Sequence, residues 1–330
     1  MQQNKIVFVT GASGLLGINV IQDLLNNNYN VVGILRNKSK FPLAENDRLE
    51  IILGDITDSK SYQEALKKAQ IVIHIAAITD QNINDYSIYK SINIDASKAL
   101  LSKSMENNIG TFINVSSANA FGYGSLENLG DEKKAIKSPF DKSLYALSKL
   151  EAQNEILKLG NTSQKTKVVN VNPTFMIGAY DTKPSSGRIV LSAYNKKIIF
   201  HPPGGKSFIN VVDAARTITK AIDLGKHGES YLLSGENLSY KQFYKKVSKA
   251  LNQKSTFVKI PKFLLIFIGY LGSFGRLFGV KTDVSVTNLR TLCISNFYSN
   301  RKAKEYLNHI QNPIENGIET AIEWFNLNKS

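Results

Sequence analysis

The feature that most constrains the fold is a regular alternation of continuous apolar runs with helical stretches through residues 5–172. The apolar runs are rich in Val and Ile and lack the polar residue at every second position that a half-exposed strand shows. Such strands are buried on both faces, as in a parallel sheet whose crossovers are helices. The alternation therefore predicts an α/β protein with a doubly wound parallel sheet. We expect strands at 5–10, 30–35, 49–53, 71–76, 111–116 and 167–172, and helices at 15–27, 61–69, 92–106 and 143–159.

The alternation weakens after Asn172, and the remaining pattern predicts a smaller, mostly helical part. We expect two domains, 1–177 and 178–330, with short segments around 208–234 returning to the first one. Within the second domain the pattern indicates short strands at 208–212 and 231–234, helices at 212–224, 240–251 and 312–325, and a loop-rich stretch over 178–205.

Three glycines join the first predicted strand to the first predicted helix, in the segment TGASGLLG at 10–17. Gly11 permits a tight turn, Gly14 lets the backbone approach a pyrophosphate, and Gly17 lets the helix pack closely on the sheet. The positive end of the helix dipole then faces the phosphates. At the first strand–helix junction of such a series, this pattern predicts a dinucleotide site.

The second predicted strand is followed by basic side chains and by no carboxylate. Arg36 follows this strand, and no carboxylate occurs between Val31 and Leu43. A site that prefers NAD usually has a carboxylate here for the ribose 2′-hydroxyl, whereas an arginine suits the 2′-phosphate of NADP. We therefore expect NADP(H), aided by Lys38 or Lys40, with NAD(H) as the alternative. Asp55, after the third predicted strand, is placed to accept a hydrogen bond from the adenine amino group.

Tyr145 and Lys149 are four residues apart in a predicted helix, so their side chains share one face. A phenol with a pKa of about 10 exchanges protons poorly at neutral pH. A nearby ammonium and a positive nicotinamide ring would lower that pKa. Ser117, after the fifth predicted strand, is placed to hydrogen-bond the substrate oxygen. These three residues predict hydride-transfer chemistry between an alcohol and a carbonyl.

The chain resembles the extended short-chain dehydrogenases/reductases, also called the NAD-dependent epimerase/dehydratase family. The matching segments are TGASGLLG (10–17), GD (54–55), HIAA (74–77), SSANAFG (116–122), YALSK (145–149), NP (172–173) and FINVVDAA (208–215). Within this family it is most similar to the dihydroflavonol reductase-like and hydroxysteroid dehydrogenase-like branch. The resemblance implies a Rossmann fold, and it implies that Ser117, Tyr145 and Lys149 are catalytic and that Asn93 is structural.

The cofactor-binding residues expected from these motifs and this resemblance lie along the whole first domain and slightly beyond its last strand. They are Gly11, Ser13, Gly14, Leu15, Leu16, Gly17, Arg36, Lys40, Asp55, Ile56, Ala76, Ala77, Tyr145, Lys149, Pro173, Thr174 and Met176. The chain departs from the sugar-nucleotide epimerases of the family at Phe121, where those enzymes commonly have tyrosine. The basic Arg36 weakens the epimerase interpretation further, since those enzymes mostly hold NAD.

Three functions follow from these observations. The first is an NADP(H)-dependent oxidoreductase that reduces a carbonyl of an apolar or aromatic small molecule to an alcohol, or the reverse. The second is a sugar-nucleotide epimerase or dehydratase with tightly bound NAD. The third is a non-catalytic protein that keeps a bound dinucleotide, and the intact Ser117, Tyr145 and Lys149 argue against it.

Composition excludes several other classes. One cysteine, Cys293, excludes an intrachain disulfide framework and a cysteine-based zinc site, and the four histidines lack metal-ligand spacing, so we expect no metal. His74 lies inside a predicted strand, so we expect a packed core histidine. No secretory signal is recognised, and no apolar run is long enough to span a membrane, which favours a cytoplasmic protein.

The net charge of +14 is concentrated in the second half of the chain. Residues 237–304 hold 13 basic side chains against Asp283 alone. Within them, residues 263–279 form a dense apolar run, FLLIFIGYLGSFGRLFG. The run predicts either a helix pair that closes over an apolar substrate or, through 263–281, a peripheral membrane contact. No nucleic-acid-reading motif accompanies the basic residues, so we expect no nucleic acid as a partner, and a monomer or a homodimer.

Overall fold

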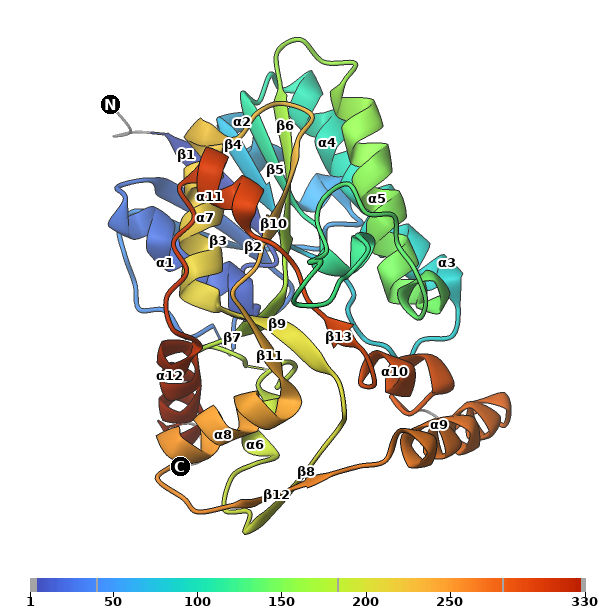
Figure 1. The fold of residues 1–330 in the computed structure, drawn as a ribbon. Helices are drawn as coiled ribbons and strands as arrows, with labels where there is room; N and C mark the ends of the chain where they lie inside the picture. Colours follow the sequence, from blue (N-terminus) through green and yellow to red (C-terminus); the bar gives the residue numbers. More distant parts are fainter. Residues whose placement is uncertain (1–4, 40, 183, 281, 328–330) are drawn as a thin grey trace.

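A computed structural model describes residues 5–39, 41–182, 184–280 and 282–327 of the chain (Figure 1). Its main sheet has seven parallel strands in the order β10-β6-β5-β4-β1-β2-β3. These strands are β1 (Ile6–Thr10), β2 (Asn30–Leu35), β3 (Leu49–Leu53), β4 (Ile71–His74), β5 (Thr111–Val115), β6 (Lys167–Pro173) and β10 (Ser230–Leu233). The predicted doubly wound parallel sheet is therefore confirmed, and the predicted strands 30–35 and 49–53 coincide with β2 and β3.

Helices cover both faces of this sheet (Figure 1). Those of the first half are α1 (Leu15–Asn26), α2 (Gln63–Lys68), α3 (Tyr86–Tyr89), α4 (Ala96–Glu106) and α5 (Leu144–Gly160), with short 3-10 turns at Ser59–Ser61, Ala118–Ala120 and Phe140–Lys142. A π-helical segment, Lys90–Asp95, joins α3 to α4, so the predicted helix at 92–106 begins with a wider turn than expected. The predicted helix at 61–69 is shorter, because a 3-10 turn replaces its start.

Side chains alternate between the two faces of the sheet, as the pleat requires. Val7 and Val9 of β1 pack in one core with α1, α7 (Val211–Leu224) and α11 (Arg301–Leu307). Phe8 points to the opposite face and packs with α2, α4 and α5. Both layers are apolar and closed, which explains why the strands carry unbroken runs of Val and Ile.

The second half of the chain builds two smaller sheets below the main one (Figure 1). One contains β7 (Phe175–Ile177), β9 (Gly205–Asn210), β11 (Glu236–Ser239) and β13 (Ser295–Asn296), and the other pairs β8 (Ile198–His201) with β12 (Thr256–Lys259). The helices here are α6 (Arg188–Leu191), α8 (Tyr240–Ala250), α9 (Lys262–Leu277), α10 (Val286–Thr291) and α12 (Ile314–Leu327). The loop expected over 178–205 is thus partly wrong, since α6 and β8 lie within it.

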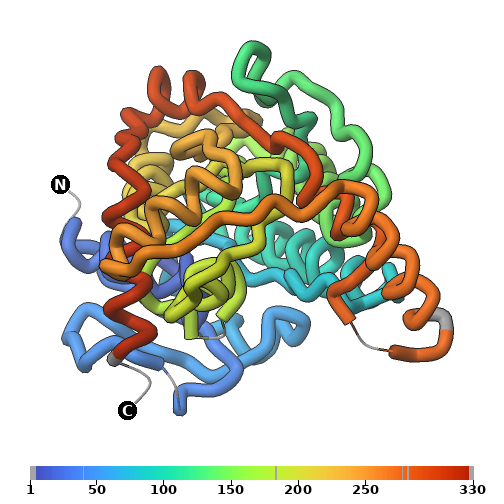
Figure 2. Tube along the Cα trace, turned by 60° about the horizontal axis from the view of Figure 1, so that its bottom comes forward, coloured from blue at the N-terminus to red at the C-terminus, as the bar shows by residue number. Residues whose placement is uncertain are grey.

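The chain crosses between the two halves more than once. After β9 it returns to the main sheet, where α7 packs on α1 and β10 pairs with the outer edge of β6. The view in Figure 2 brings the lower sheets forward and shows β12 crossing that face toward α9. The smaller half has its own core, in which the rings of Phe208 and Phe243 stack with centroids 4.0 Å apart.

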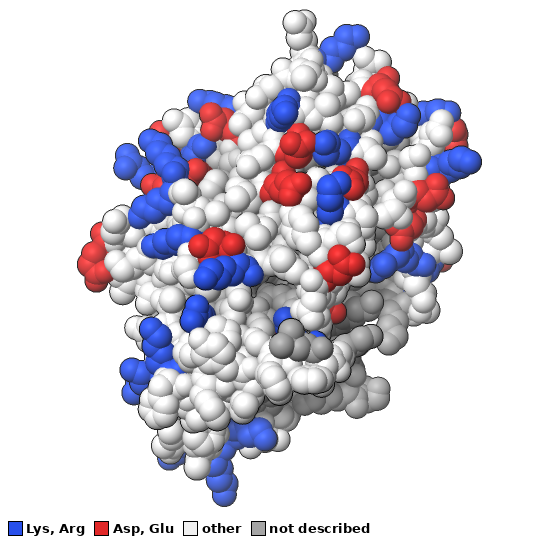
Figure 3. All heavy atoms as spheres, turned by 90° about the vertical axis from the view of Figure 1, so that its right-hand side faces the viewer, with Lys and Arg blue, Asp and Glu red and all other residues white. Residues whose placement is uncertain are grey.

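Charge is unevenly distributed on the face that carries α9. Figure 3 shows most Asp and Glu side chains toward the upper part of this face, whereas the described lower part is largely uncharged, with Lys and Arg around it. Within the described residues, no helix has the length and apolar character needed to cross a membrane.

His74 ties three elements together at the carboxyl end of β4. Its Nδ1 lies 2.8 Å from the hydroxyl of Thr10 in β1, and its Nε2 lies 2.7 Å from the hydroxyl of Ser97 in α4. The side chain is buried, and burial, with a smaller contribution from Lys149, lowers its pKa to about 3. His74 is therefore the packed core histidine expected from the sequence.

This burial predicts a pH-dependent loss of stability. The unfolded chain protonates this histidine near pH ~6.5, whereas the folded chain keeps it neutral down to about pH 3. Its contribution is complete above the unfolded pKa and is lost as the pH falls through this window, by up to about 1.4 kcal/mol per pH unit. Urea denaturation near pH 7 and near pH 5 should show a steeper loss in the wild type than in His74→Gln. An equal loss in both proteins would contradict the assignment.

Candidate active site

The glycine-rich turn between β1 and α1 is held by close backbone contacts. Gly11 has a φ of +69°, and a Cβ there would lie 2.8 Å from the backbone nitrogen of Ala76. A Cβ on Gly17 would lie 2.1 Å from the carbonyl oxygen of Gly11. Both positions therefore require glycine, because a side chain would separate α1 from the turn or the turn from β4.

The N-terminus of α1 offers its amides to a ligand. Gly14 is the N-cap, and it supplies no side-chain hydrogen bond to the first turn, which also lacks an acidic residue. Gly14 is exposed, and a Cβ there would meet only ordinary van der Waals contact with Gly11. The uncapped N–H groups and the helix dipole together form an anion site that fits a pyrophosphate.

Thr10 joins this turn to the end of β4. Its hydroxyl accepts hydrogen bonds of 3.1 Å from the backbone N–H groups of both Ile75 and Ala76. Ala76 and Ala77 are half-buried and lie directly after β4, beside the turn at Gly11. The small alanine side chains leave the backbone accessible at the point where the two strand ends diverge.

Arg36 and Asp55 lie at the ends of the neighbouring strands β2 and β3. Asp55 Oδ1 accepts hydrogen bonds from the Thr57 backbone N–H at 2.9 Å and from the Thr57 hydroxyl at 2.8 Å. These bonds, and more weakly the positive charge of Arg36, hold the pKa of Asp55 below its ordinary value. Arg36 is exposed, and no ion pair joins it to a carboxylate in the described part of the chain.

The arrangement fits the nucleoside end of a dinucleotide. Asp55 is an anion whose Oδ2 makes no hydrogen bond with the described residues, so it can accept one from an adenine amino group. The guanidinium of Arg36 is available to a phosphate on the adjacent ribose. Lys40, the other base expected here, lies outside the described residues.

Ser117, Tyr145 and Lys149 come together at the carboxyl end of β5. Ser117 follows that strand and caps the 3-10 turn at Ala118–Ala120, while Tyr145 and Lys149 lie in the first two turns of α5. The Lys149 ammonium donates a 2.8 Å hydrogen bond to the carbonyl oxygen of Val115 in β5. Only 6% of Lys149 and 9% of Ser117 are exposed, so these two side chains are shielded from bulk water, whereas Tyr145 is half-buried.

The local environment shifts the pKa of both titratable groups. Burial raises the pKa of the Tyr145 phenol, and a hydrogen bond from Ser117 offsets part of this increase. Burial lowers the pKa of the Lys149 ammonium to about 8. The lowering of the Tyr145 pKa expected from Lys149 and an oxidised nicotinamide ring therefore stays a prediction for the complex.

Asn93 joins the segment after β4 to α5, the helix that carries Tyr145 and Lys149. It lies in the π-helical segment, where its Oδ1 accepts a 2.8 Å bond from the Ile78 N–H and its Nδ2 donates 3.1 Å to the Ile78 carbonyl oxygen. The same Nδ2 donates a 2.9 Å bond to the Ser148 hydroxyl, between Tyr145 and Lys149 on α5. The side chain thus fixes the segment after β4 against the helix that carries the reacting residues.

The remaining residues expected at the cofactor lie along the same edge. Leu16 is buried, Leu15, Ile56 and Met176 are half-buried against the two cores, and Pro173 ends β6. Thr174 follows it, and its backbone N–H and hydroxyl both donate to the carbonyl oxygen of Leu233. The carbonyl oxygen of Ser13 accepts a 3.3 Å bond from the Thr182 hydroxyl, so the chain after β7 folds back over the glycine-rich turn.

Lys206 is a desolvated lysine near the end of β6 that the sequence did not single out. It lies in β9, and its ammonium sits 4.9 Å from the ring centre of Phe175, next to the end of β6. Burial lowers its pKa to about 8, and no described carboxylate forms an ion pair with it. A basic residue inside an otherwise uncharged strand, GKSFIN, was the available signal. Its position in the smaller half fits a polar or anionic group of a substrate.

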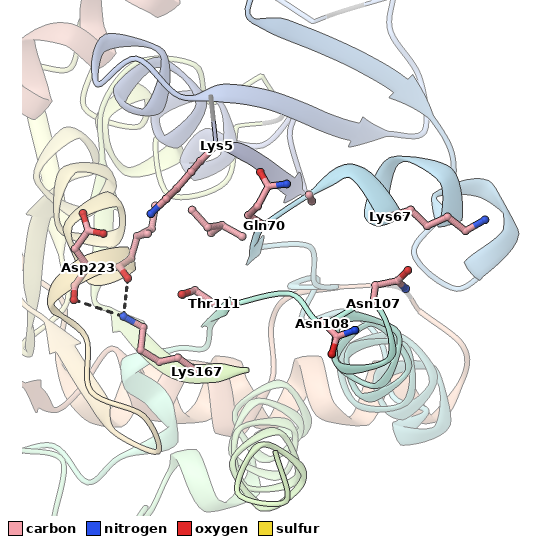
Figure 4. Close-up of a pocket in the computed structure, with 12 residues that line it drawn as sticks. Lys5, Lys67, Gln70, Asn107, Asn108, Thr111, Lys167 and Asp223 are labelled. Atoms are coloured by element: carbon pink, nitrogen blue, oxygen red, sulfur yellow. Dashed lines mark hydrogen bonds between the residues drawn. The ribbon is translucent and has the colours of Figure 1, made fainter. Parts of the chain in front are cut away.

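A hollow of about 640 Å³ lies at the opposite edge of the main sheet (Figure 4). Its lining includes Lys5, Ile71, Thr111 and Lys167, which precede or begin β1, β4, β5 and β6. The Lys167 ammonium points across it and bonds the carbonyl oxygen of Ile222 at 2.6 Å. Ligands of open parallel sheets bind at the carboxyl ends of the strands, so this hollow is not the active site. No cluster of three or more metal-ligating side chains occurs among the described residues.

Comparison with known proteins agrees with this geometry. The sequence model of the NAD dependent epimerase/dehydratase family matches residues 7–234. The chain belongs to this family and is an extended short-chain dehydrogenase/reductase, an NAD(P)-dependent enzyme.

Several curated relatives are similar over most of the chain. A proposed dihydroflavonol 4-reductase of Synechocystis sp. is 26% identical and covers 96% of this chain and 94% of its own length. A decarboxylating sterol-4-alpha-carboxylate 3-dehydrogenase of Dictyostelium discoideum is 26% identical, covering 73% and 74%. A UDP-glucose 4-epimerase of Vibrio cholerae is 24% identical, covering 85% and 84%.

Solved structures show the same fold over the whole chain. The crystal structure of the protein gox2253 has a TM-score of 0.81 at 26% identity, covering 98% of this chain and 99% of its own. A variant UDP-glucuronic acid 4-epimerase of Bacillus cereus, in complex with NAD, has a TM-score of 0.77 at 18% identity, covering 98% and 99%. The latter likeness concerns the fold alone.

Removing the Asn93 side chain should destabilise the site. Asn93→Ala leaves the N–H of Ile78 without its partner, which we expect to cost about 1–3 kcal/mol in the free energy of unfolding. Urea denaturation measures the loss. The matched control is Asn26→Ala at an exposed position, which should change stability by less than about 0.5 kcal/mol. Similar small losses in both variants would show that Asn93 does not support the site.

Proposed function

We propose that this protein is an NADP(H)-dependent oxidoreductase that reduces a carbonyl of an apolar or aromatic small molecule to an alcohol, or catalyses the reverse. The observation that carries the proposal is the convergence of Ser117, Tyr145 and Lys149 at the carboxyl end of β5. These groups lie in the same sheet edge as the glycine-rich turn of α1, so a dinucleotide bound there would reach them.

The bound nicotinamide would supply or accept the hydride. Tyr145 donates its phenolic proton to the carbonyl oxygen as that oxygen gains negative charge, and it takes the proton back in the reverse reaction. Ser117 donates a hydrogen bond to the same oxygen and fixes its direction. Lys149 places a positive charge next to the phenol, which stabilises the phenolate form, and its ammonium has further protons to donate to the nicotinamide ribose.

The choice of NADP(H) rests on Arg36. A 2′-phosphate adds charge next to an exposed guanidinium that pairs with no described carboxylate, and arginine binds phosphate with two parallel hydrogen bonds. NAD(H) fits the same glycine-rich turn and the same Asp55, so these two features do not distinguish NADP(H) from NAD(H). Support for an apolar substrate comes from the named substrates of the dihydroflavonol and sterol relatives.

A sugar-nucleotide epimerase or dehydratase is the second candidate, and Lys206 favours it. A half-buried, desolvated ammonium near the end of β6 without a described acidic partner is suited to a phosphate of a nucleotide substrate. The alternatives differ in redox balance. A reductase consumes NADPH as it turns over, whereas an epimerase or dehydratase regenerates its bound NAD and shows no net consumption.

We propose a reducing compartment such as the cytoplasm for this activity, because the single cysteine is free and the reaction draws on a reduced dinucleotide. We further propose a small-molecule carbonyl or alcohol as the partner, without nucleic acid, and a monomer or homodimer. Residues 263–281 would contact a membrane surface peripherally.

Tyr145→Phe should abolish turnover and retain cofactor binding, because it removes only the exchangeable proton. NADPH consumption with a panel of aldehydes and ketones measures turnover, and fluorescence titration measures NADPH binding. The matched control Tyr306→Phe removes a hydroxyl from a partly exposed tyrosine of α11 and should leave both measurements unchanged. Unchanged turnover in Tyr145→Phe would refute its role.

Arg36→Ala should weaken NADPH binding and leave NADH binding unchanged. A charge-assisted bond to phosphate contributes about 1.5–3 kcal/mol, which corresponds to a loss of about 10- to 150-fold. Side-by-side titration of NADPH and NADH measures both affinities, with Arg48→Ala as the control for loss of a half-buried arginine that bonds Asn28. A wild-type protein that prefers NADH, or that is purified with NAD bound, would favour the epimerase candidate instead.

A further inference from the structure

The helix α9 exposes an apolar stripe along its whole length. Its exposed large side chains include Phe263, Phe267, Tyr270, Leu271 and Phe274, of which Phe263 is 76% and Phe274 is 62% exposed. No charged residue lies between Lys262 and Arg276. An isolated apolar residue on a surface is ordinary, but a contiguous stripe of this kind marks a contact with another apolar phase.

The opposite side of α9 is already packed against the protein. A Cβ on Gly269 would lie 3.0 Å from the Cα of Val286, and one on Gly272 would lie 2.4 Å from the carbonyl oxygen of Val284. The two glycines thus let α9 lie directly on the segment that leads into α10. The aromatic stripe cannot fold onto this segment as well, so it faces outward.

A second apolar surface lies next to the start of α9. In the β8–β12 ribbon, Ile198 and Phe200 are exposed at 53% and 61%, and Val258, which pairs with Phe200, is exposed at 38%. Two residues separate the end of β12 from α9, and both elements lie on the face that Figure 2 brings forward. We call this ribbon face and the α9 stripe together the docking face.

The charges around the docking face identify its partner. Five exposed lysines border it, and none forms an ion pair with a described carboxylate; they are Lys196, Lys197, Lys254, Lys259 and Lys262. No Asp or Glu occurs in 184–212 or in 237–282. A second copy of the chain would bring two such basic borders together and repel, whereas an anionic bilayer attracts the lysines and accepts the aromatic side chains.

We propose that the docking face binds the surface of an anionic lipid bilayer, with the α9 stripe inserted among the acyl chains and the lysines on the headgroups. At 16 residues α9 is too short to cross the bilayer and lies along its surface. The proposal rests on the surface alone and does not depend on the reaction that the protein catalyses.

Docking would also fix the position of a loop near the active site. The Arg276 guanidinium at the end of α9 bonds the Gln81 carbonyl oxygen at 3.0 Å and Asn84 Oδ1 at 3.1 Å. These residues belong to the segment between β4 and α3, whose Ile78 is held by Asn93 beside α5. This last step alone rests on the proposed function: an apolar substrate dissolved in the bilayer would meet the protein on the side of this loop.

Flotation with vesicles of phosphatidylcholine, with and without phosphatidylserine, tests the proposal on the full chain. We expect the wild type to float with the anionic vesicles at low salt and to be released at high salt. Phe267→Ser combined with Phe274→Ser should lower binding at least about tenfold. The control pair Leu53→Ser and Ile310→Ser, at positions 62% and 58% exposed elsewhere, should bind as the wild type does.

The lysines are tested separately. Lys259→Gln and Lys262→Gln should each lower binding to anionic vesicles about fivefold, and the double variant should bind both vesicle types weakly. Circular dichroism and NADPH titration check that every variant is folded. If the wild type does not float with anionic vesicles, the proposal is overturned. The proposal is also overturned if the wild type does not bind vesicles but forms a dimer, and if Phe267→Ser and Phe274→Ser convert that dimer to monomers. The docking face would then bind a second copy of the chain.

Discussion

The backbone contact of Gly17 with Gly11, and of Gly11 with Ala76, determines the geometry on which the rest of the site depends. It brings α1 against the turn, and the turn against the end of β4, more closely than any side chain would permit. Thr10 and His74 lock the same junction with buried hydrogen bonds. As a result, the N-terminus of α1 lies beside β1 and β4, the two strands between which the strand order reverses. Ligands of open parallel sheets bind at this point.

The desolvated lysines lower the stability of the fold, and the packing of the core does not require them. Lys149 is buried, its one described hydrogen bond is to a neutral carbonyl oxygen, and burial lowers its pKa to about 8. Lys206 in β9 is a second desolvated ammonium, and it forms no ion pair with a described carboxylate. Burying unpaired cations destabilises a fold. A bound anionic ligand such as a dinucleotide would offset this cost, since it brings negative charge to the carboxyl ends of the strands.

Much of this architecture could be predicted from local sequence. The continuous apolar runs placed β2 and β3 correctly, and the glycine spacing located the turn that the close contacts of Gly11 and Gly17 require. Long-range pairing could not be predicted, because nothing local tells β10 to join β6 or gathers β7, β9, β11 and β13 into one sheet. The π-helical turn at Lys90–Asp95 was missed for a related reason. It coincides with the bonds that Asn93 makes to residues far from it in the chain.

The region 263–279 shows how small residues determine which side of an apolar helix is covered by the protein. From the sequence, this glycine-interrupted apolar run predicts either a helix pair that closes over an apolar substrate or a peripheral membrane contact. In the fold, α9 and α10 do form a pair, but Gly269 and Gly272 place their side of α9 against Val284 and Val286. The large apolar residues without such a constraint, among them Phe263, Phe267 and Phe274, are left on the outer side. The glycines therefore determine which side of α9 is covered, and its aromatic residues are left on the exposed side.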